Sequence, residues 1–249
     1  MSRKRLSAVF FDAMGTILSL KPWVLIMGNE FTQLSKACNV GYEELSKTWG
    51  IEWKKVNQEI RRDKSKPFQN VRELFCEAFT IIGRKLGMQL QQEDIQGIIK
   101  RVSDYVNENA VAYPDVRGTI EGLKKGGHRV GVISDADADD LTLQLRSAGI
   151  LSSLDTVTTS SEVMSYKPNR RIFEIALVKM GCKPAEACHI GDSQEFDVLG
   201  ANNAGLSSIL VTHGKTEVNR DLPRPTYVVR EVHEVIPLLT YRNKKTVFI

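Results

Sequence analysis

The sequence predicts an α/β protein in which a doubly wound, Rossmann-like parallel sheet is interrupted by an inserted helical-bundle cap. Two observations lead to this expectation. From about residue 112 onward, short apolar runs typical of strands alternate with segments of helical periodicity. Such alternation produces right-handed crossovers and a parallel sheet. Residues 20–107 carry only helical patterns, which indicates a separate small bundle.

The first strand is expected at residues 7–12, where the apolar run Ala8 to Phe11 leads directly into Asp12. A turn follows at Gly15 and Thr16. Because no second strand pattern lies nearby, this strand most simply joins the later sheet. The helical stretch then becomes an insertion. We therefore expect a core domain of residues 1–19 and 108–249, and a cap domain of residues 20–107.

Apolar residues at helical spacing predict four amphipathic helices in the insertion, at residues 21–38, 42–62, 70–87 and 93–106. In the second part of the chain, β-branched and apolar runs predict strands at residues 128–134, 155–160, 187–192, 207–212 and 226–229. Helices are predicted between and after them, at residues 138–150, 169–181, 197–205 and 232–240. The first of these helices opens with three acids, Asp137, Asp139 and Asp140. We expect their negative charges to interact favourably with the helix dipole at its N-terminus.

Composition narrows the class of protein. The 249 residues are 42% hydrophobic and 26% charged, as in an ordinary globular protein, and the net charge is +4. Because the basic residues are dispersed, no nucleic-acid partner is expected. Neither a signal peptide nor an apolar run of the ~18 residues that span a bilayer is visible, so we expect a cytoplasmic protein without membrane contact. The four cysteines lack the spacing of a metal knuckle or a disulfide framework. A monomer and a homodimer both remain possible.

Polar residues stand at the carboxyl ends of the predicted strands, the edge at which parallel sheets bind their ligands. They are Asp12, Ser134, Asp135, Lys167, Asp192 and Asp197. A carboxylate at such a place can attack phosphorus or carbon and form a covalent intermediate. Attack on a phosphate dianion needs cations, which Lys167 and a Mg²⁺ ion held by Asp12 and Asp192 could supply. Taken singly, each residue also fits a structural role, such as a helix cap or a surface lysine.

In this order, the strand ends resemble the motifs of the haloacid dehalogenase superfamily of aspartate-nucleophile hydrolases. The segment "FFDAMGTIL" is similar to the first motif, "VGVISD" to the second and "YKPNRRIFEIAL" to the third. The segment "HIGDSQEFDVLGANNAGL" resembles the fourth motif, in which Gly-Asp-Ser is followed by a second aspartate. The four motifs cover nearly the whole core, whereas the cap matches only in position and in helical character.

The resemblance implies a role for each matching position. Asp12 is expected to be the nucleophile, with Ser134 and the Asp135 backbone binding the phosphoryl group. Lys167 is expected to pair with Asp12 and with the transferring group. Mg²⁺ is expected on Asp12, on the backbone carbonyl of Met14 and on Asp192, with Asp197 ligating the ion or orienting its surroundings. These seven residues form the expected catalytic, substrate-binding and metal-binding set.

Met14 departs from the pattern of most phosphatases in the family, which carry a second aspartate there. The thioether cannot protonate a leaving group. Catalysis by a positioned general acid or base typically raises a rate by about 10²–10⁴-fold. The expected function is a Mg²⁺-dependent phosphohydrolase that acts on a small phosphorylated metabolite through an aspartyl phosphate. Water, a cap residue or Asp135 would then move the proton, unless the leaving group departs without one. The chain is thus identified as a member of a subset that lacks the second acid.

Three other functions fit the same departure. A metal-independent 2-haloacid dehalogenase needs no acid because halide leaves unprotonated, although the fourth motif here resembles that of the metal-binding members. A phosphonoacetaldehyde hydrolase also replaces the acid, but it requires a cap lysine that no pattern singles out. A catalytically weakened protein could bind a phosphorylated ligand, although such a binder would not need the nucleophile Asp12.

Overall fold

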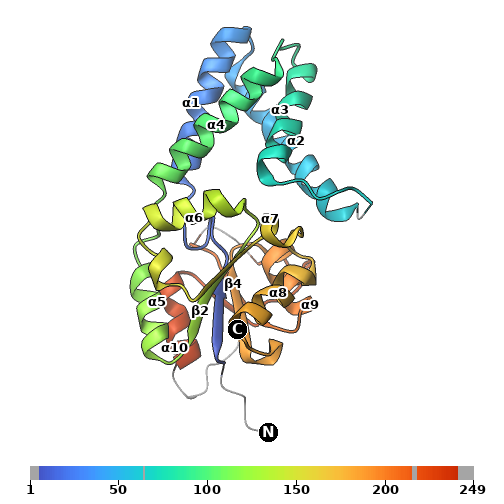
Figure 1. Cartoon of the computed structure of the whole chain (residues 1–249). Coiled ribbons are helices and arrows are strands. Elements are labelled where there is room, and N and C mark those ends of the chain that lie inside the picture. The colour runs from blue at the N-terminus through green and yellow to red at the C-terminus, as the bar shows by residue number, and fades with distance from the viewer. Residues whose placement is uncertain (1–5, 64, 215–217, 241–249) are drawn as a thin grey trace.

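The structure is a computed structural model that describes residues 6–63, 65–214 and 218–240. It has a six-stranded parallel sheet with helices on both faces. A group of four long helices lies beyond the carboxyl ends of the strands (Figure 1). This arrangement confirms the expected α/β fold class. Within the described ranges, no helix is both long and apolar enough to cross a bilayer.

The first strand of the chain lies in the middle of the sheet. In spatial order the strands are β3 (Thr156–Thr159), β2 (Arg129–Ser134), β1 (Ala8–Phe11), β4 (Ala187–Gly191), β5 (Ser207–Val211) and β6 (Tyr227–Val229). In the register, Val9 lies opposite Val130 on one side and Cys188 on the other. Because β1 has a parallel neighbour on both sides and helices over both faces, it requires the continuous apolar run seen in the sequence.

Alternate residues of β1 pack into two separate apolar layers, as a strand requires. Val9 and Phe11 face a cluster formed with α5 (Val116–Lys125), α6 (Ala138–Ser147) and α10 (Val235–Thr240). Ala8 and Phe10 face a second cluster formed with α7 (Ser160–Val163), α8 (Arg170–Met180) and α9 (Leu199–Asn203). The sheet is therefore covered on both faces, which is the doubly wound arrangement that the sequence predicts (Figure 1).

The four long helices are α1 (Lys21–Cys38), α2 (Tyr42–Arg62), α3 (Val71–Lys85) and α4 (Gln92–Asn109). They share an apolar core of their own, which includes Trp49 against the ring of Phe79 at 4.6 Å between centroids. The chain enters and leaves this helical section side by side, since the Ser19 N–H donates to the Val111 carbonyl at 2.9 Å. The section is thus inserted after β1, although residues 20–107 as a separate cap domain remain a prediction.

Two local features differ from the sequence-based expectations. Helix α5 was not predicted, although Val116, Ile120 and Leu123 recur at helical spacing and are fully buried. Asp137 precedes α6, yet its side chain makes no cap there. Its two oxygens instead accept hydrogen bonds from the backbone N–H groups of Val71 and Arg72, at 2.9 and 3.1 Å. Asp137 therefore caps α3 of the helical section and ties that section to the core.

Candidate active site

Three predicted residues lie at the carboxyl ends of three adjacent strands. Asp12 follows β1, Ser134 ends β2 and Asp192 follows β4. The Asp12 N–H donates to the carbonyl of Ile190 at 2.8 Å, which extends the β1–β4 pairing up to the carboxylate. Asp12 and Ser134 are only 6% and 2% exposed, and Asp192 is half-buried. The sheet therefore brings together residues that are up to 180 positions apart, as the sequence predicts.

A tight turn after Asp12 shapes the mouth of the site. The N–H of Gly15 donates to the carbonyl of Leu18 at 2.9 Å. Gly15 has a φ of +89°, and a Cβ at this position would lie 2.6 Å from Oδ2 of Asp192. Both facts require glycine, because another residue would be strained and would push the carboxylate away. The Thr16 hydroxyl lies 3.2 Å from Asp12 Oδ2 and 3.3 Å from Asp192 Oδ1, so it links the two acids.

Lys167 provides the positive charge at the centre of the site. Its Nζ lies 2.6 Å from Oδ1 of Asp12 and 2.6 Å from Oδ1 of Asp197, and its side chain is 3% exposed. Burial lowers the pKa of this ammonium, but the two carboxylates outweigh that effect and raise the pKa above its usual range. Lys167 is therefore protonated. A buried ion pair of this kind is costly to break, since removing one partner strands the other charge.

Asp197 is held from several sides. His189 Nε2 lies 2.9 Å from its Oδ1, and the Ser193 N–H donates to Oδ2 at 3.0 Å. Although burial raises the pKa of Asp197, Lys167 and His189 together hold it well below its usual range. Gly191 makes room for this carboxylate, because a Cβ at residue 191 would lie 2.2 Å from the Asp197 carboxyl carbon. His189 is thus buried beside the site, as a partner of Asp197.

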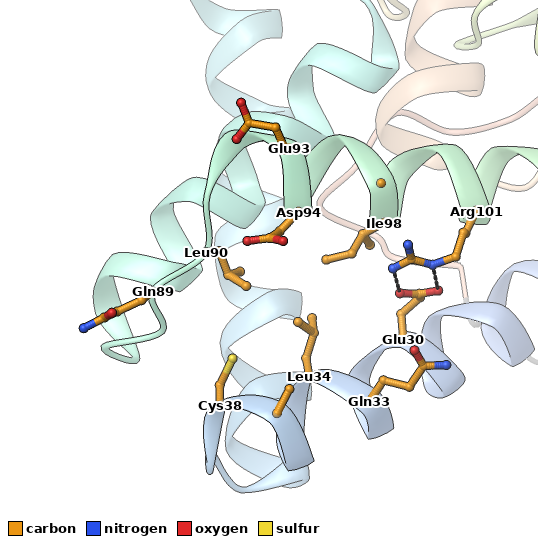
Figure 2. Close-up of a pocket in the computed structure, with 12 residues that line it drawn as sticks. Glu30, Gln33, Leu34, Cys38, Gln89, Leu90, Glu93, Asp94, Ile98 and Arg101 are labelled. Atoms are coloured by element: carbon orange, nitrogen blue, oxygen red, sulfur yellow. Dashed lines mark hydrogen bonds and ion pairs between the residues drawn. The ribbon is translucent and has the colours of Figure 1, made fainter.

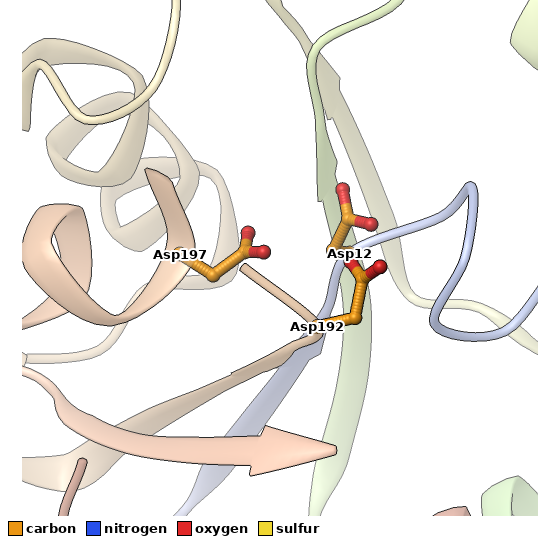
Figure 3. Close-up of side chains that lie close together, drawn as sticks. All are labelled: Asp12, Asp192 and Asp197. Atoms are coloured by element: carbon orange, nitrogen blue, oxygen red, sulfur yellow. The ribbon is translucent and has the colours of Figure 1, made fainter. Parts of the chain in front are cut away.

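The acids of the site fit a divalent cation. Asp12, Asp192 and Asp197 each place a carboxylate oxygen within 4.8 Å of the others, and Figure 3 shows the three side chains converging. Burial and then the neighbouring carboxylate of Asp12 raise the pKa of Asp192 to about 7. Burial also raises the pKa of Asp12. Three carboxylates face one ammonium, so the cluster lacks positive charge, and hard oxygen ligands are those that Mg²⁺ prefers.

Two predicted residues lie beside this centre. The side chain of Met14 packs, half-buried, against the apolar cluster of β1, β2 and α5, and its backbone bridges to Leu18. Asp135 directly follows Ser134, and its carboxylate is fully engaged. Its Oδ1 accepts the Lys167 backbone N–H at 2.9 Å, and its Oδ2 accepts Arg61 Nη2 at 2.8 Å.

Sequence reasoning did not find Thr16 and Arg61 as site residues. Thr16 had a signal, since it belongs to the Gly-Thr pair that follows Asp12. Arg61 had none, because a basic residue in the last turn of α2 is ordinary helix chemistry. Only the docking of the helical section brings its guanidinium to Asp135.

A separate hollow of about 410 Å³ lies between α1 and α4 of the helical section (Figure 2). The buried carboxylate of Glu30 faces it and is neutralised by Arg101 through hydrogen bonds of 2.9 and 2.8 Å. This pair serves the packing of α1 on α4, and the chemistry described above belongs to the strand ends.

The chain is similar to known hydrolases in sequence. The profile of the haloacid dehalogenase-like hydrolases matches residues 78–211, and the chain belongs to this family of hydrolases. It is 45% identical to a glyceraldehyde 3-phosphate phosphatase of Methanothermobacter thermautotrophicus over 109 residues, which is 44% of this chain and 48% of that protein. It is 26% identical to (S)-2-haloacid dehalogenase 4A of Burkholderia cepacia over 234 residues, 94% of this chain and 95% of the other.

Among solved structures, the fold is similar to that of a HAD phosphatase from Thermococcus onnurineus. The TM-score is 0.68 at 24% identity, with 94% of this chain and 98% of the other covered. The likeness extends over both the sheet and the helical section.

Proposed function

We propose that the chain is a Mg²⁺-dependent phosphohydrolase of a small phosphorylated metabolite that works through an aspartyl phosphate on Asp12. The observation that carries this proposal is the cluster formed by the buried Asp12, Lys167 and Asp197 and the half-buried Asp192. Its excess of carboxylates suits a divalent cation, and its lysine lies against the proposed nucleophile at 2.6 Å. The similarity to glyceraldehyde 3-phosphate phosphatase over 109 residues supports a phosphorylated substrate.

Mg²⁺, when bound, supplies the positive charge that lets a carboxylate approach a phosphate dianion. Asp12, Asp192 and the backbone carbonyl of Met14 would hold the ion. Both oxygens of Asp197 already accept hydrogen bonds within the protein, from Lys167 and His189 on one oxygen and from Ser193 on the other. Asp197 would therefore contribute to the ion's surroundings chiefly through its charge and by orienting Lys167.

The protein residues would carry out two displacement steps. In the first, a carboxylate oxygen of Asp12 attacks phosphorus, the bond from phosphorus to the leaving oxygen breaks, and the phosphoryl group is transferred to Asp12. Ser134 and the Asp135 backbone N–H would hold the phosphoryl oxygens, while Lys167 stabilises their charge. In the second step, water attacks phosphorus and loses one proton to the surrounding solvent, the bond from phosphorus to Asp12 breaks, and inorganic phosphate leaves. Residues 20–107 would act as the cap that encloses the substrate.

A 2-haloacid dehalogenase is the second candidate. The end-to-end similarity to a haloacid dehalogenase and the missing acid at Met14 favour it. Against it, Asp192 places a further carboxyl group within 4.8 Å of Asp12, and the ionised form of that group opposes an anionic haloacid unless a cation is present. The two functions therefore differ in their need for metal.

The test compares two substrates. We expect turnover of p-nitrophenyl phosphate with Mg²⁺, because nitrophenolate leaves without a proton and so does not need the missing acid. Removal of Mg²⁺ by EDTA should abolish this turnover. Release of chloride from L-2-chloropropionate without metal, in the absence of phosphatase activity, would favour the dehalogenase. No turnover of either substrate, combined with binding of inorganic phosphate, would favour the phospho-ligand-binding alternative.

A further inference from the structure

We propose that Arg61, carried by α2 of the helical section, is a positioning residue for the phosphoryl-transfer site. It would hold the backbone of Lys167 in place, so that docking of the helical section completes the site. This inference rests on the proposed function for its activity readout. Its structural part concerns only Arg61, Asp135 and Lys167, and it can be measured without turnover.

The guanidinium of Arg61 is almost fully buried, with the side chain 8% exposed. Nη2 donates to Oδ2 of Asp135 at 2.8 Å, Nε donates to the carbonyl of Lys167 at 3.0 Å, and Nη1 donates to the carbonyl of Asn57 at 2.7 Å. Two of these three acceptors belong to core residues on different strand connections. Arginine suits this place because its donors form a rigid planar fork, which a lysine cannot reproduce.

Two aromatic rings enclose the same guanidinium. Its central carbon lies 4.5 Å from the ring centroid of Tyr166 and 4.6 Å from that of Phe196. Tyr166 precedes Lys167, and Phe196 precedes Asp197, so each ring is adjacent in sequence to a charged residue of the site. A cation over aromatic faces is stabilised by their quadrupoles, the more so when it is shielded from water. Arg61 thus contacts the segments that carry the second, third and fourth motifs.

These contacts form a closed ring of hydrogen bonds around Lys167. Asp135 accepts the Lys167 N–H through one carboxylate oxygen and Arg61 through the other, while Arg61 also binds the Lys167 carbonyl. Both polar backbone groups of the lysine are therefore fixed. Its Nζ reaches Asp12 and Asp197 at 2.6 Å, a geometry that tolerates little movement. A displacement of about 1 Å in a catalytic arrangement can cost about 10²-fold in rate.

Other contacts keep the helical section docked independently of Arg61. Asp137 caps α3, Arg72 pairs with Asp140 at 2.6 Å, and Asn107 Nδ2 donates to Asp140 at 2.6 Å. Replacement of Arg61 should therefore disturb the ring around Lys167 without detaching the section. The neighbouring Arg62 is exposed in the same helical turn and provides a matched control of equal charge.

The experiment compares the full-length wild type with Arg61→Ala, Arg61→Lys and Arg62→Ala. With p-nitrophenyl phosphate and Mg²⁺, we expect Arg61→Ala to lower kcat by 10- to 100-fold, with KM changed by less than threefold. Arg61→Lys should remain at least fivefold below the wild type. Guanidinium ion at tens of millimolar, far below denaturing concentrations, should restore part of the kcat of Arg61→Ala and none in Arg62→Ala. A kcat of Arg61→Ala within twofold of the wild type, or no rescue, would overturn the proposal.

Hydrogen exchange supplies the readout that does not depend on turnover. In Arg61→Ala, the amide of Lys167 should exchange at least tenfold faster, while amides of α8 remain as in the wild type. Unchanged exchange at Lys167 would overturn the positioning role, as would equal acceleration throughout the core. A wild type without phosphatase activity would instead contradict the proposed function, and the exchange result would still decide the role of Arg61.

Discussion

Replacement of Met14 by aspartate tests whether the absence of a second acid limits turnover at this site. The turn that carries residue 14 is fixed by the bond from Gly15 N–H to the Leu18 carbonyl, so a new carboxyl group would stand two residues from the nucleophile on a defined backbone. Asp135 does not offer a ready substitute, because both of its oxygens already accept hydrogen bonds. We therefore expect Met14→Asp to introduce a proton donor that the native site lacks.

The size of the effect follows from what the new group can do. A positioned acid is worth about 10²–10⁴-fold when the leaving group must be protonated, and close to nothing when it departs as a stable anion. There is also a cost. When all are ionised, Asp12, Asp192 and Asp197 carry two negative charges in excess of Lys167, and the variant would carry three. We expect the variant to require Mg²⁺ more strongly for thermal stability than the wild type does.

The assay is kcat/KM with Mg²⁺ for a series of phosphate monoesters that spans aryl and alkyl leaving groups. The dependence of log(kcat/KM) on leaving-group pKa should be steep for the wild type and shallower for Met14→Asp, with the gain confined to alkyl esters. Met14→Asn is the matched control, since it has the same shape without a proton to give. Equal rates for the aspartate and asparagine variants, or an equal gain on aryl and alkyl esters, would contradict a proton-donor role for the introduced carboxyl group.

Three further outcomes follow from the geometry. Gly15→Ala should destabilise the fold by about 1–3 kcal/mol, because residue 15 has a positive φ; it should also weaken Mg²⁺ binding through displacement of Asp192, and thermal melts with a Mg²⁺ titration would show both. Lys167→Met should cost about 3–5 kcal/mol in urea unfolding and abolish turnover, since it leaves the buried carboxylates of Asp12 and Asp197 without their ammonium partner; a variant as stable as the wild type would contradict this. Glu52 accepts hydrogen bonds from Lys85 and Lys55, and these bonds lower the pKa of Glu52. Its stabilising contribution is therefore present at neutral pH and lost as the pH falls below about 4.5, the usual value; the destabilisation by Glu52→Gln should shrink over that range, and a difference independent of pH would argue against the ion pair.

The strand ends could be predicted because their position depends on local pattern alone. An apolar run such as Ala8–Phe11 must be buried on both faces, and its end then places Asp12 at the edge where parallel strands bind ligands. The same argument applies to Ser134 and Asp192. Lys167 lies beyond a short helix rather than directly on a strand. Its charge could be assigned to this site from the sequence, but its pairing with Asp12 was indicated by the resemblance to a known motif.

The remaining features depend on how distant parts of the chain dock. Arg61 contacts the carbonyl of Lys167 across 106 positions, and no periodicity in α2 distinguishes it from its neighbour Arg62. Asp137 has the local pattern of a cap for α6 but caps α3 instead. The N–H groups of Val71 and Arg72 in the first turn of α3 have no partner within that helix, and docking brings them to the Asp137 carboxylate. Helix α5 was missed for a local reason. Gly118 and Gly122 weaken its helical propensity, although its buried stripe is regular.

The proposed mechanism requires a covalent phosphoryl group on Asp12. A rapid-quench experiment with a ³²P-labelled phosphate monoester and Mg²⁺, followed by peptide mapping, tests it directly. We predict transient acid-stable but hydroxylamine-labile label on the peptide that contains Asp12, and neither label nor turnover in Asp12→Asn. Full turnover in Asp12→Asn, or wild-type turnover without label at any quench time, would contradict it.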